Sequence, residues 1–116
     1  MTGKVASGDG EPRLVLCTCP DEASAGRIAR ALVEGRLAAC VNVLPGLRSV
    51  YRWQGAVEEA QEHLLLIKTC AARLPDLERA VRELHPYELP ELVAVPITGG
   101  LAAYLDWVRE NSRPEG

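Results

Sequence analysis

Hydrophobic positions along the chain follow two spacings, one typical of short strands and one typical of amphipathic helices. The run RLVLCTC at 13–19 is rich in strand-forming residues and stops at Pro20, so it predicts a strand. A helix is predicted next. Its start signals are Pro20, Asp21 and Glu22, and Gly35 closes it. Between them, apolar residues recur at i, i+3, i+4, i+7 and i+8: Ala25, Ile28, Ala29, Leu32 and Val33.

A long hairpin is predicted after this helix. The segments LAACVNVL (37–44) and LRSVYRW (47–53) have strand composition, and the Pro45-Gly46 pair between them favours a bulge or a bend. Gln54-Gly55 turns the chain, and the return strand runs through EHLLLIKTC, 62–70. Each arm would span about 12–16 residues, more than twice the usual strand length, so we expect the hairpin to protrude from the body.

The last third of the chain predicts a helix, a strand and a second helix. Pro75 suits a first helical turn, and the apolar spacing from Leu77 to Leu84 predicts a helix that ends at His85-Pro86. ELVAVPI (91–97) predicts the fourth strand, and a C-terminal helix follows Gly99-Gly100. The order βαββαβ plus a helix predicts an α+β, ferredoxin-like (split βαβ) sandwich.

Three of the predicted strands are apolar at consecutive positions, in the segments LVLC, LLLI and LVAV. A sheet with one face in water would alternate instead, so both faces of this sheet should be buried. The chain predicts no further helices for the second face. We therefore expect a homo-oligomer, in which neighbouring copies and their hairpin arms supply the cover.

Composition and charge narrow the class of protein. The 116 residues, 47% hydrophobic and 25% charged, suit one globular domain at 13–112, with a disordered tail at 1–12 and a short tail at 113–116. A net charge of -3 with scattered basic residues argues against nucleic-acid binding. Neither a membrane-spanning run nor a secretion signal is evident, which predicts a cytoplasmic protein with reduced thiols.

The cysteines and histidines allow both chemical and structural interpretations. Cys17 and Cys19 are two residues apart in a strand, so they share one face and could bind a soft metal, or fill space as small apolar groups. Cys40 and Cys70 are interpreted as packing residues. His85 could ligate a metal, transfer a proton or end a helix. His63, between polar neighbours, is expected to be solvated or at an interface.

The hairpin carries two further groups. Ser49, Tyr51 and Trp53 share one face near its tip, which favours subunit contact first and small-ligand stacking second. The carboxylates at 58, 59 and 62 indicate a solvated charge run, or paired carboxylates for acid/base or metal chemistry. A nucleophile–base pair of diagnostic spacing is absent, so we do not expect an enzyme.

Several motifs in order, ALVEGRLAACVNVLPGLRSVYRWQG, LLLIKT, HPYELPELVAVPI and YLDW, resemble the CutA divalent-cation tolerance family. The resemblance implies a ferredoxin-like protomer in a homotrimer laced together by its hairpin arms. It also implies copper binding through Cys17 and His85. Some members have a second histidine where this chain has Leu84, so weak or incidental copper binding is expected. Cys19 could partly compensate, since thiolates prefer Cu(I), or could only pack.

The resemblance further implies a cleft at the subunit interface. This cleft would suit a small anionic ligand, with Lys68 supplying the positive charge. Its lining would be Trp53, Glu62, Lys68, His85, Tyr87, Tyr104 and Trp107. Two functions follow as expectations. The first is a trimeric copper-binding or metal-tolerance protein, and the second is a signalling or scaffolding trimer that binds a small anion or a partner protein.

Overall fold

The computed structural model describes residues 10–114. The strands are β2 (Pro12–Cys19), β3 (Cys40–Trp53), β4 (Ala56–Cys70) and β5 (Val93–Pro96). The helices are α1 (Glu22–Glu34), α2 (Leu74–Leu84), which follows a short 3-10 turn at Ala71–Arg73, and α3 (Ala102–Asn111). None of the helices in this part of the chain is long and apolar enough to cross a membrane.

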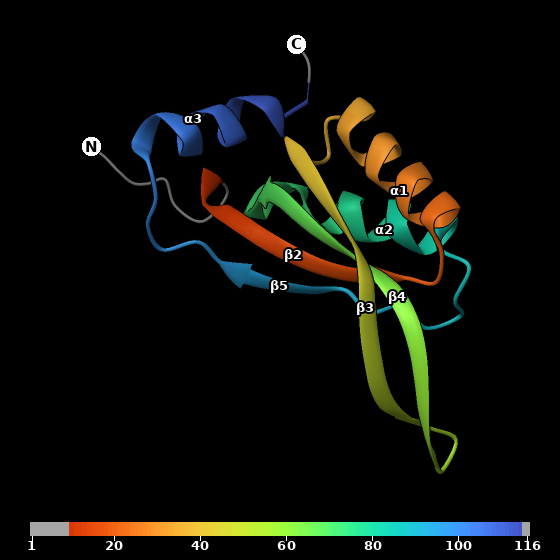
Figure 1. Cartoon of the computed structure of the whole chain (residues 1–116). Helices are drawn as coiled ribbons and strands as arrows, with labels where there is room; N and C mark the ends of the chain where they lie inside the picture. Colours follow the sequence, from red (N-terminus) through yellow and green to blue (C-terminus); the bar gives the residue numbers. More distant parts are fainter. Residues whose placement is uncertain (1–9, 115–116) are drawn as a thin grey trace.

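The four strands form one sheet in the order β3-β4-β2-β5, and every neighbouring pair is antiparallel. Helices α1 and α2 cover one face of this sheet, while α3 lies at the end of the sheet away from the hairpin tip (Figure 1). This arrangement confirms the predicted ferredoxin-like sandwich with an added C-terminal helix.

The core lies between the sheet and helices α1 and α2. Val15 and Cys17 of β2 stand opposite Ile67 and Leu65 of β4, and all four are essentially inaccessible to solvent. The helices complete the core with Ile28 and Leu32 from α1 and with Leu77 and Val81 from α2. Their spacing of four places each pair on one helical face, as the sequence pattern predicts.

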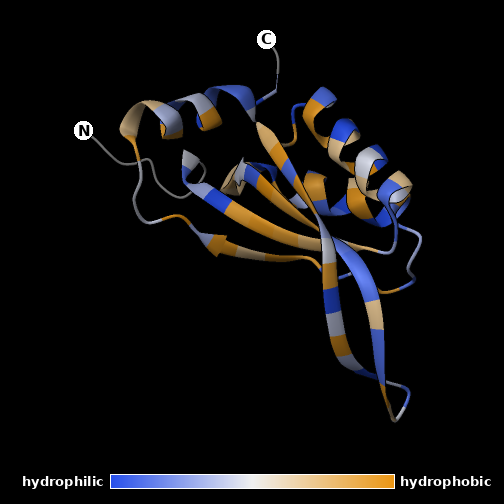
Figure 2. Cartoon of the chain, viewed as in Figure 1, coloured by the Kyte–Doolittle hydropathy of each residue, from blue (hydrophilic) through white to orange (hydrophobic). Residues whose placement is uncertain are grey.

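The second face of the sheet, called the open face here, is also apolar but is not covered. Figure 2 shows hydrophobic residues at consecutive positions along β2 and β5. On the open face Leu14, Leu16, Leu64 and Leu66 are only half-buried, and Val93 and Val95 are 49% and 41% exposed. The residues that line the open face are Leu14, Leu16, Thr18, Glu62, Leu64, Leu66, Lys68, Val93 and Val95. Apolar residues therefore occupy both faces of these strands. Within one protomer, helices α1 and α2 cover only one of the two faces.

The hairpin of β3, β4 and their connecting turn, called the arm here, projects beyond the body (Figure 1). Its strands have 14 and 15 residues, within the predicted range. The register shifts between Leu44 and Leu47, where Gly46 has φ of 81°, so the predicted bulge is present. Gln54 and Gly55 both have positive φ, 51° and 84°, which is the pair of signs of a type I′ hairpin turn.

Two of the predicted strands have wrong ends. The strand predicted from Leu37 begins at Cys40, because Arg36 has a positive φ of 57° and the amides of Leu37 and Ala38 bond back to the Leu32 carbonyl. These bonds continue the end of α1 rather than a sheet. The fourth strand also covers only Val93–Pro96 of the predicted 91–97.

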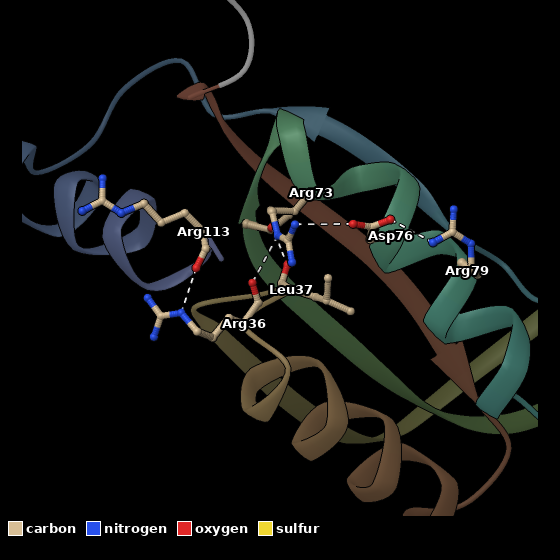
Figure 3. A network of polar contacts seen from close by, with 7 residues as sticks. Arg36, Leu37, Arg73, Asp76, Arg79 and Arg113 are labelled. Carbon is tan, nitrogen blue, oxygen red and sulfur yellow. Dashed lines mark hydrogen bonds and ion pairs between the residues drawn. The ribbon is translucent and has the colours of Figure 1, made fainter. Parts of the chain in front are cut away.

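An arginine network ties the C-terminal helix to the body (Figure 3). Arg36 donates from Nε to the carbonyl of Arg113 and from Nη2 to that of Glu110, both at 2.8 Å. Arg73 donates in turn to the Arg36 carbonyl at 3.2 Å and pairs with Asp76 at 3.4 Å. A cation at the carboxyl end of α3 is favoured by the helix dipole and satisfies free carbonyls.

The predicted tails lie mostly outside the described residues. Residues 1–9 and 115–116 are not described, whereas Pro12 is buried as the first residue of β2. At the other end, the Arg113 carbonyl takes part in the arginine network.

Candidate functional site

The structure brings Cys17, Cys19 and His85 together at one end of the core. Cys17 and Cys19 lie near the end of β2, on the helix-covered face, and His85 is the residue that caps α2. Their ligand atoms all lie within 4.8 Å of one another, and the exposed fractions are 0%, 0% and 7%. The two sequence-predicted ligands are therefore neighbours, and Cys19 adds a third donor.

His85 also forms a structural corner. Its Nε2 lies 2.7 Å from the carbonyl oxygen of Thr18, and its Nδ1 accepts from the backbone N–H of Tyr87 at 3.1 Å. An accepting Nδ1 carries no proton, so the bond to Thr18 requires a neutral ring protonated at Nε2. His85 thus fastens the end of β2 to the loop that follows α2.

The two thiols influence each other, although Cys17 Sγ donates to the Thr18 carbonyl at 3.9 Å. The neighbouring Cys19 thiol, together with burial, raises the pKa of Cys17. The neighbouring Cys17 thiol lowers the pKa of Cys19. Cys19 is therefore the more easily ionised thiol of the pair, and thiolate is the form that binds metals.

His63 lies near this cluster but does not belong to it. It stands opposite Cys19 in the β2–β4 register. The sequence predicts that His63 is solvated or at an interface. In the protomer its side chain is half-buried, and its buried Nδ1 has no hydrogen-bond partner among the described residues. Of the other two cysteines, Cys70 is buried, whereas Cys40 is only partly so.

A second candidate site, called the arm pocket here, is a cavity of about 880 Å³ between the arm and the loop after His85. Thr18 of β2 also contributes to its wall. The arm supplies Ser49, Val50, Tyr51, Trp53, Glu58 and Glu62, and the loop supplies Pro86, Tyr87, Glu88, Leu89, Pro90 and Glu91. Ser49, Tyr51 and Trp53 share one face of the arm, as predicted, and this face lines the pocket.

Glu62 departs from the predicted solvated charge run. It is 6% exposed, and its Oε2 accepts a hydrogen bond of 2.8 Å from the Tyr87 hydroxyl. Burial, together with this bond to a carboxylate, raises the pKa of Tyr87. Glu62 and Tyr87, both expected in a cleft, are thus direct partners.

Within one protomer the other four expected cleft residues are not in this lining. His85 lies in the cluster with Cys17 and Cys19, and Lys68, Tyr104 and Trp107 lie elsewhere. Lys68 stands opposite Leu14 and Cys40 in the register and donates to Asn42 Oδ1. Tyr104 and Trp107 stack with ring centroids 5.5 Å apart, and burial and the neighbouring Cys40 raise the pKa of Tyr104. Lys68 is six residues from Glu62 along β4, roughly 20 Å at the rise of a strand. Lys68 is therefore not part of the arm pocket lining.

Sequence reasoning missed two features of these sites. The Thr18 carbonyl, the partner of His85, has no signal in the sequence, because every residue carries the same backbone groups. The pocket carboxylates Glu88 and Glu91 were also missed, although glutamates beside prolines in the segment PYELPE mark a polar loop next to the histidine.

Comparisons with known proteins agree with one another. Residues 13–111 match the family model described as CutA1 divalent ion tolerance protein. The chain is 59% identical over 99 residues to the divalent-cation tolerance protein CutA of Thermus thermophilus, covering 85% of this chain and 96% of that one. It is 48% identical over 101 residues to human protein CutA, covering 87% of this chain but 56% of the human protein. The solved structure of the divalent cation tolerance protein from Thermus thermophilus superposes with a TM-score of 0.87 at 57% identity, covering 88% of this chain and 99% of that one.

Proposed function

The chain belongs to the CutA1 divalent ion tolerance family, and on this premise we propose that it binds copper at Cys17, Cys19 and His85. The observation that carries the proposal is the convergence of three buried donor atoms within 4.8 Å of one another. Buried thiols are common as packing groups, but two thiols beside an imidazole also form a metal-ligand set.

The donor types favour a soft ion. Thiolates prefer Cu(I), and imidazole is also a good copper ligand, so we propose Cu(I) as the form that is held most tightly. Leu84, where some family members have a second histidine, packs against the core in this chain. Cys19 supplies the third donor instead, from the strand rather than from the helix end.

Binding would compete with existing hydrogen bonds. Both ring nitrogens of His85 are engaged, by the Thr18 carbonyl and the Tyr87 N–H, so coordination through either one removes a bond. Each such bond contributes about 0.5–1.5 kcal/mol net. This cost supports the expectation of modest affinity.

We also propose a homotrimer that has no catalytic activity and works in the cytoplasm. The uncovered apolar open face and the projecting arm support an assembly, because neighbouring copies could bury both. Cytoplasmic reductants would keep Cys17 and Cys19 as thiols able to bind metal.

The test is a Cu(I) titration of the reduced, tag-free protein, followed by native mass spectrometry. We expect one ion per protomer, and a clear loss of binding in Cys17→Ser, Cys19→Ser and His85→Ala. Cys70→Ser is the matched control, since Cys70 is buried but outside the cluster. Retained copper in all three cluster variants, or equal loss in the control, would remove the assignment.

A further inference from the structure

His63 carries the one buried side-chain polar atom that has no hydrogen-bond partner in residues 10–114, the ring nitrogen Nδ1. A buried donor or acceptor without a partner is rare in a folded protein and calls for an explanation. Because Nδ1 is already enclosed within one protomer, a neighbouring copy that packs against the surface does not reach it. Assembly therefore does not supply the missing partner.

The sheet places His63 beside the cysteine–histidine cluster. His63 of β4 stands directly opposite Cys19 of β2, so the two side chains lie on the same face. Helices α1 and α2 of the same chain cover this face, where Cys17 also lies (Figure 1). Directly opposed residues have Cβ atoms about 4.5–5.5 Å apart, and zinc–ligand bonds are about 2.0–2.3 Å long. An imidazole and a thiolate at these two positions are therefore close enough to bind one ion.

The His63 ring has to turn to join the cluster. Within the described part of the chain only the donors of Cys17, Cys19 and His85 lie within 4.8 Å of one another, so His63 is adjacent to this set but outside it. Rotation about the side-chain bonds moves the imidazole between rotamers without moving the strand. Coordination through His63 Nδ1 breaks no hydrogen bond to a described residue, whereas both ring nitrogens of His85 are already engaged.

With His63 included, the donors match the ligand set of a tetrahedral zinc site. Two cysteines with two histidines are a standard set for Zn²⁺, which in structural sites takes four protein ligands. Charge also favours a divalent ion. Two thiolates and two neutral imidazoles carry two negative charges, which Zn²⁺ balances, so the buried site becomes neutral overall. Cu⁺ balances only one of the two thiolates.

We propose that His63 is a fourth ligand, which completes the tetrahedral coordination of Zn²⁺ by the cysteine–histidine cluster. The inference rests on the metal cluster of the proposed function and adds a ligand and a second class of ion to it. Cu(I) binding uses the three donors described above and does not require His63.

The test compares metal binding by the wild type and by His63→Ala, both as the full-length, reduced, tag-free protein in its native oligomeric state. Competition with a chromophoric chelator gives the Zn²⁺ affinity. Co²⁺ is the spectroscopic probe, because its visible d–d bands are intense in tetrahedral coordination and weak in octahedral coordination. We expect one Zn²⁺ per protomer and intense Co²⁺ bands in the wild type.

His63→Ala should lose the intense Co²⁺ bands and bind Zn²⁺ about tenfold or more weakly, since loss of a group that only supports a ligand already costs about 10–100-fold. His63→Gln, which keeps a polar side chain, should show the same loss. Gln61→Ala is the matched control, an exposed position two residues away on the same strand, and should change neither readout.

A Cu(I) titration of the same proteins separates this inference from the proposed function. His63→Ala should retain Cu(I). If the wild type binds neither Cu(I) nor Zn²⁺, the cluster itself is not a metal site and both proposals fail. If Cu(I) binds but His63→Ala leaves the Zn²⁺ affinity unchanged, or the wild type gives only weak Co²⁺ bands, the role of His63 alone is overturned.

Discussion

His85→Ala should destabilise the metal-free protein, because the imidazole holds the fold together whether or not copper binds. The substitution leaves the carbonyl of Thr18, a residue only 6% exposed, without its 2.7 Å partner and removes the acceptor of the Tyr87 N–H. An unsatisfied buried polar group costs about 1–3 kcal/mol and an ordinary hydrogen bond contributes about 0.5–1.5 kcal/mol net, so we expect a loss of about 2–4 kcal/mol.

The assay is guanidinium unfolding with a chelator and a reductant present, at one fixed protomer concentration, since assembly contributes to apparent stability. His63→Ala is the matched control. The His63 ring has no hydrogen bond to another described residue at its buried Nδ1, so its removal should cost less, about 1 kcal/mol. If His85→Ala unfolds within about 0.5 kcal/mol of the wild type, or is no less stable than His63→Ala, the structural role is refuted.

Three further outcomes are expected. Arg36→Ala loses the hydrogen bonds to the carbonyls at the end of α3 and should cost about 1–3 kcal/mol in thermal or chemical unfolding; an unchanged midpoint would contradict this. Leu66→Glu places a charge on the open face and should yield monomers by light scattering, whereas a trimer mass would argue against assembly through that face. Hydrogen bonds from Ser24, first of all from its backbone amide, lower the pKa of Asp21 in the folded state. The ionised Asp21 carboxylate therefore stabilises the fold above about pH 4, and this stabilisation is lost as the pH falls through the lowered pKa of the folded state. In Asp21→Asn the melting temperature should therefore fall less steeply with decreasing pH below about pH 4 than in the wild type. An equal slope in the variant and the wild type would contradict this role of Asp21.

Most elements of the fold were predictable because their signals are local. Asp21 accepts from the Ser24 amide at 2.8 Å and caps α1 where the sequence predicts a start, and His85 ends α2 before Pro86. The strand ends were harder to predict. Leu37 has strand composition, but Arg36 adopts a positive φ and the chain first bonds back to α1. This choice depends on partners in α3 and in the 3-10 turn before α2.

The candidate site was predictable only in part. Strand alternation alone places Cys17 and Cys19 on one face, and the structure agrees. Glu62 has the local signal of a solvated charge run, yet its position opposite the loop after His85 buries it against Tyr87. Lys68, on the same face of the same strand, faces Asn42 instead, because six residues of extended chain carry it to the other end of the sheet.

The sequence by itself determined the order of elements, the long arm, the apolar character of both sheet faces and the residue types able to bind copper. These follow from periodicity, turn residues and side-chain chemistry, which act within a few positions of each other. Only the tertiary structure decided that His85 meets Thr18 across 67 positions, that Cys19 joins the cluster, and that the arm pocket is lined by carboxylates without a basic residue. The physical reason is that a local pattern selects the face on which a side chain lies, whereas the group it meets there depends on how distant segments pack.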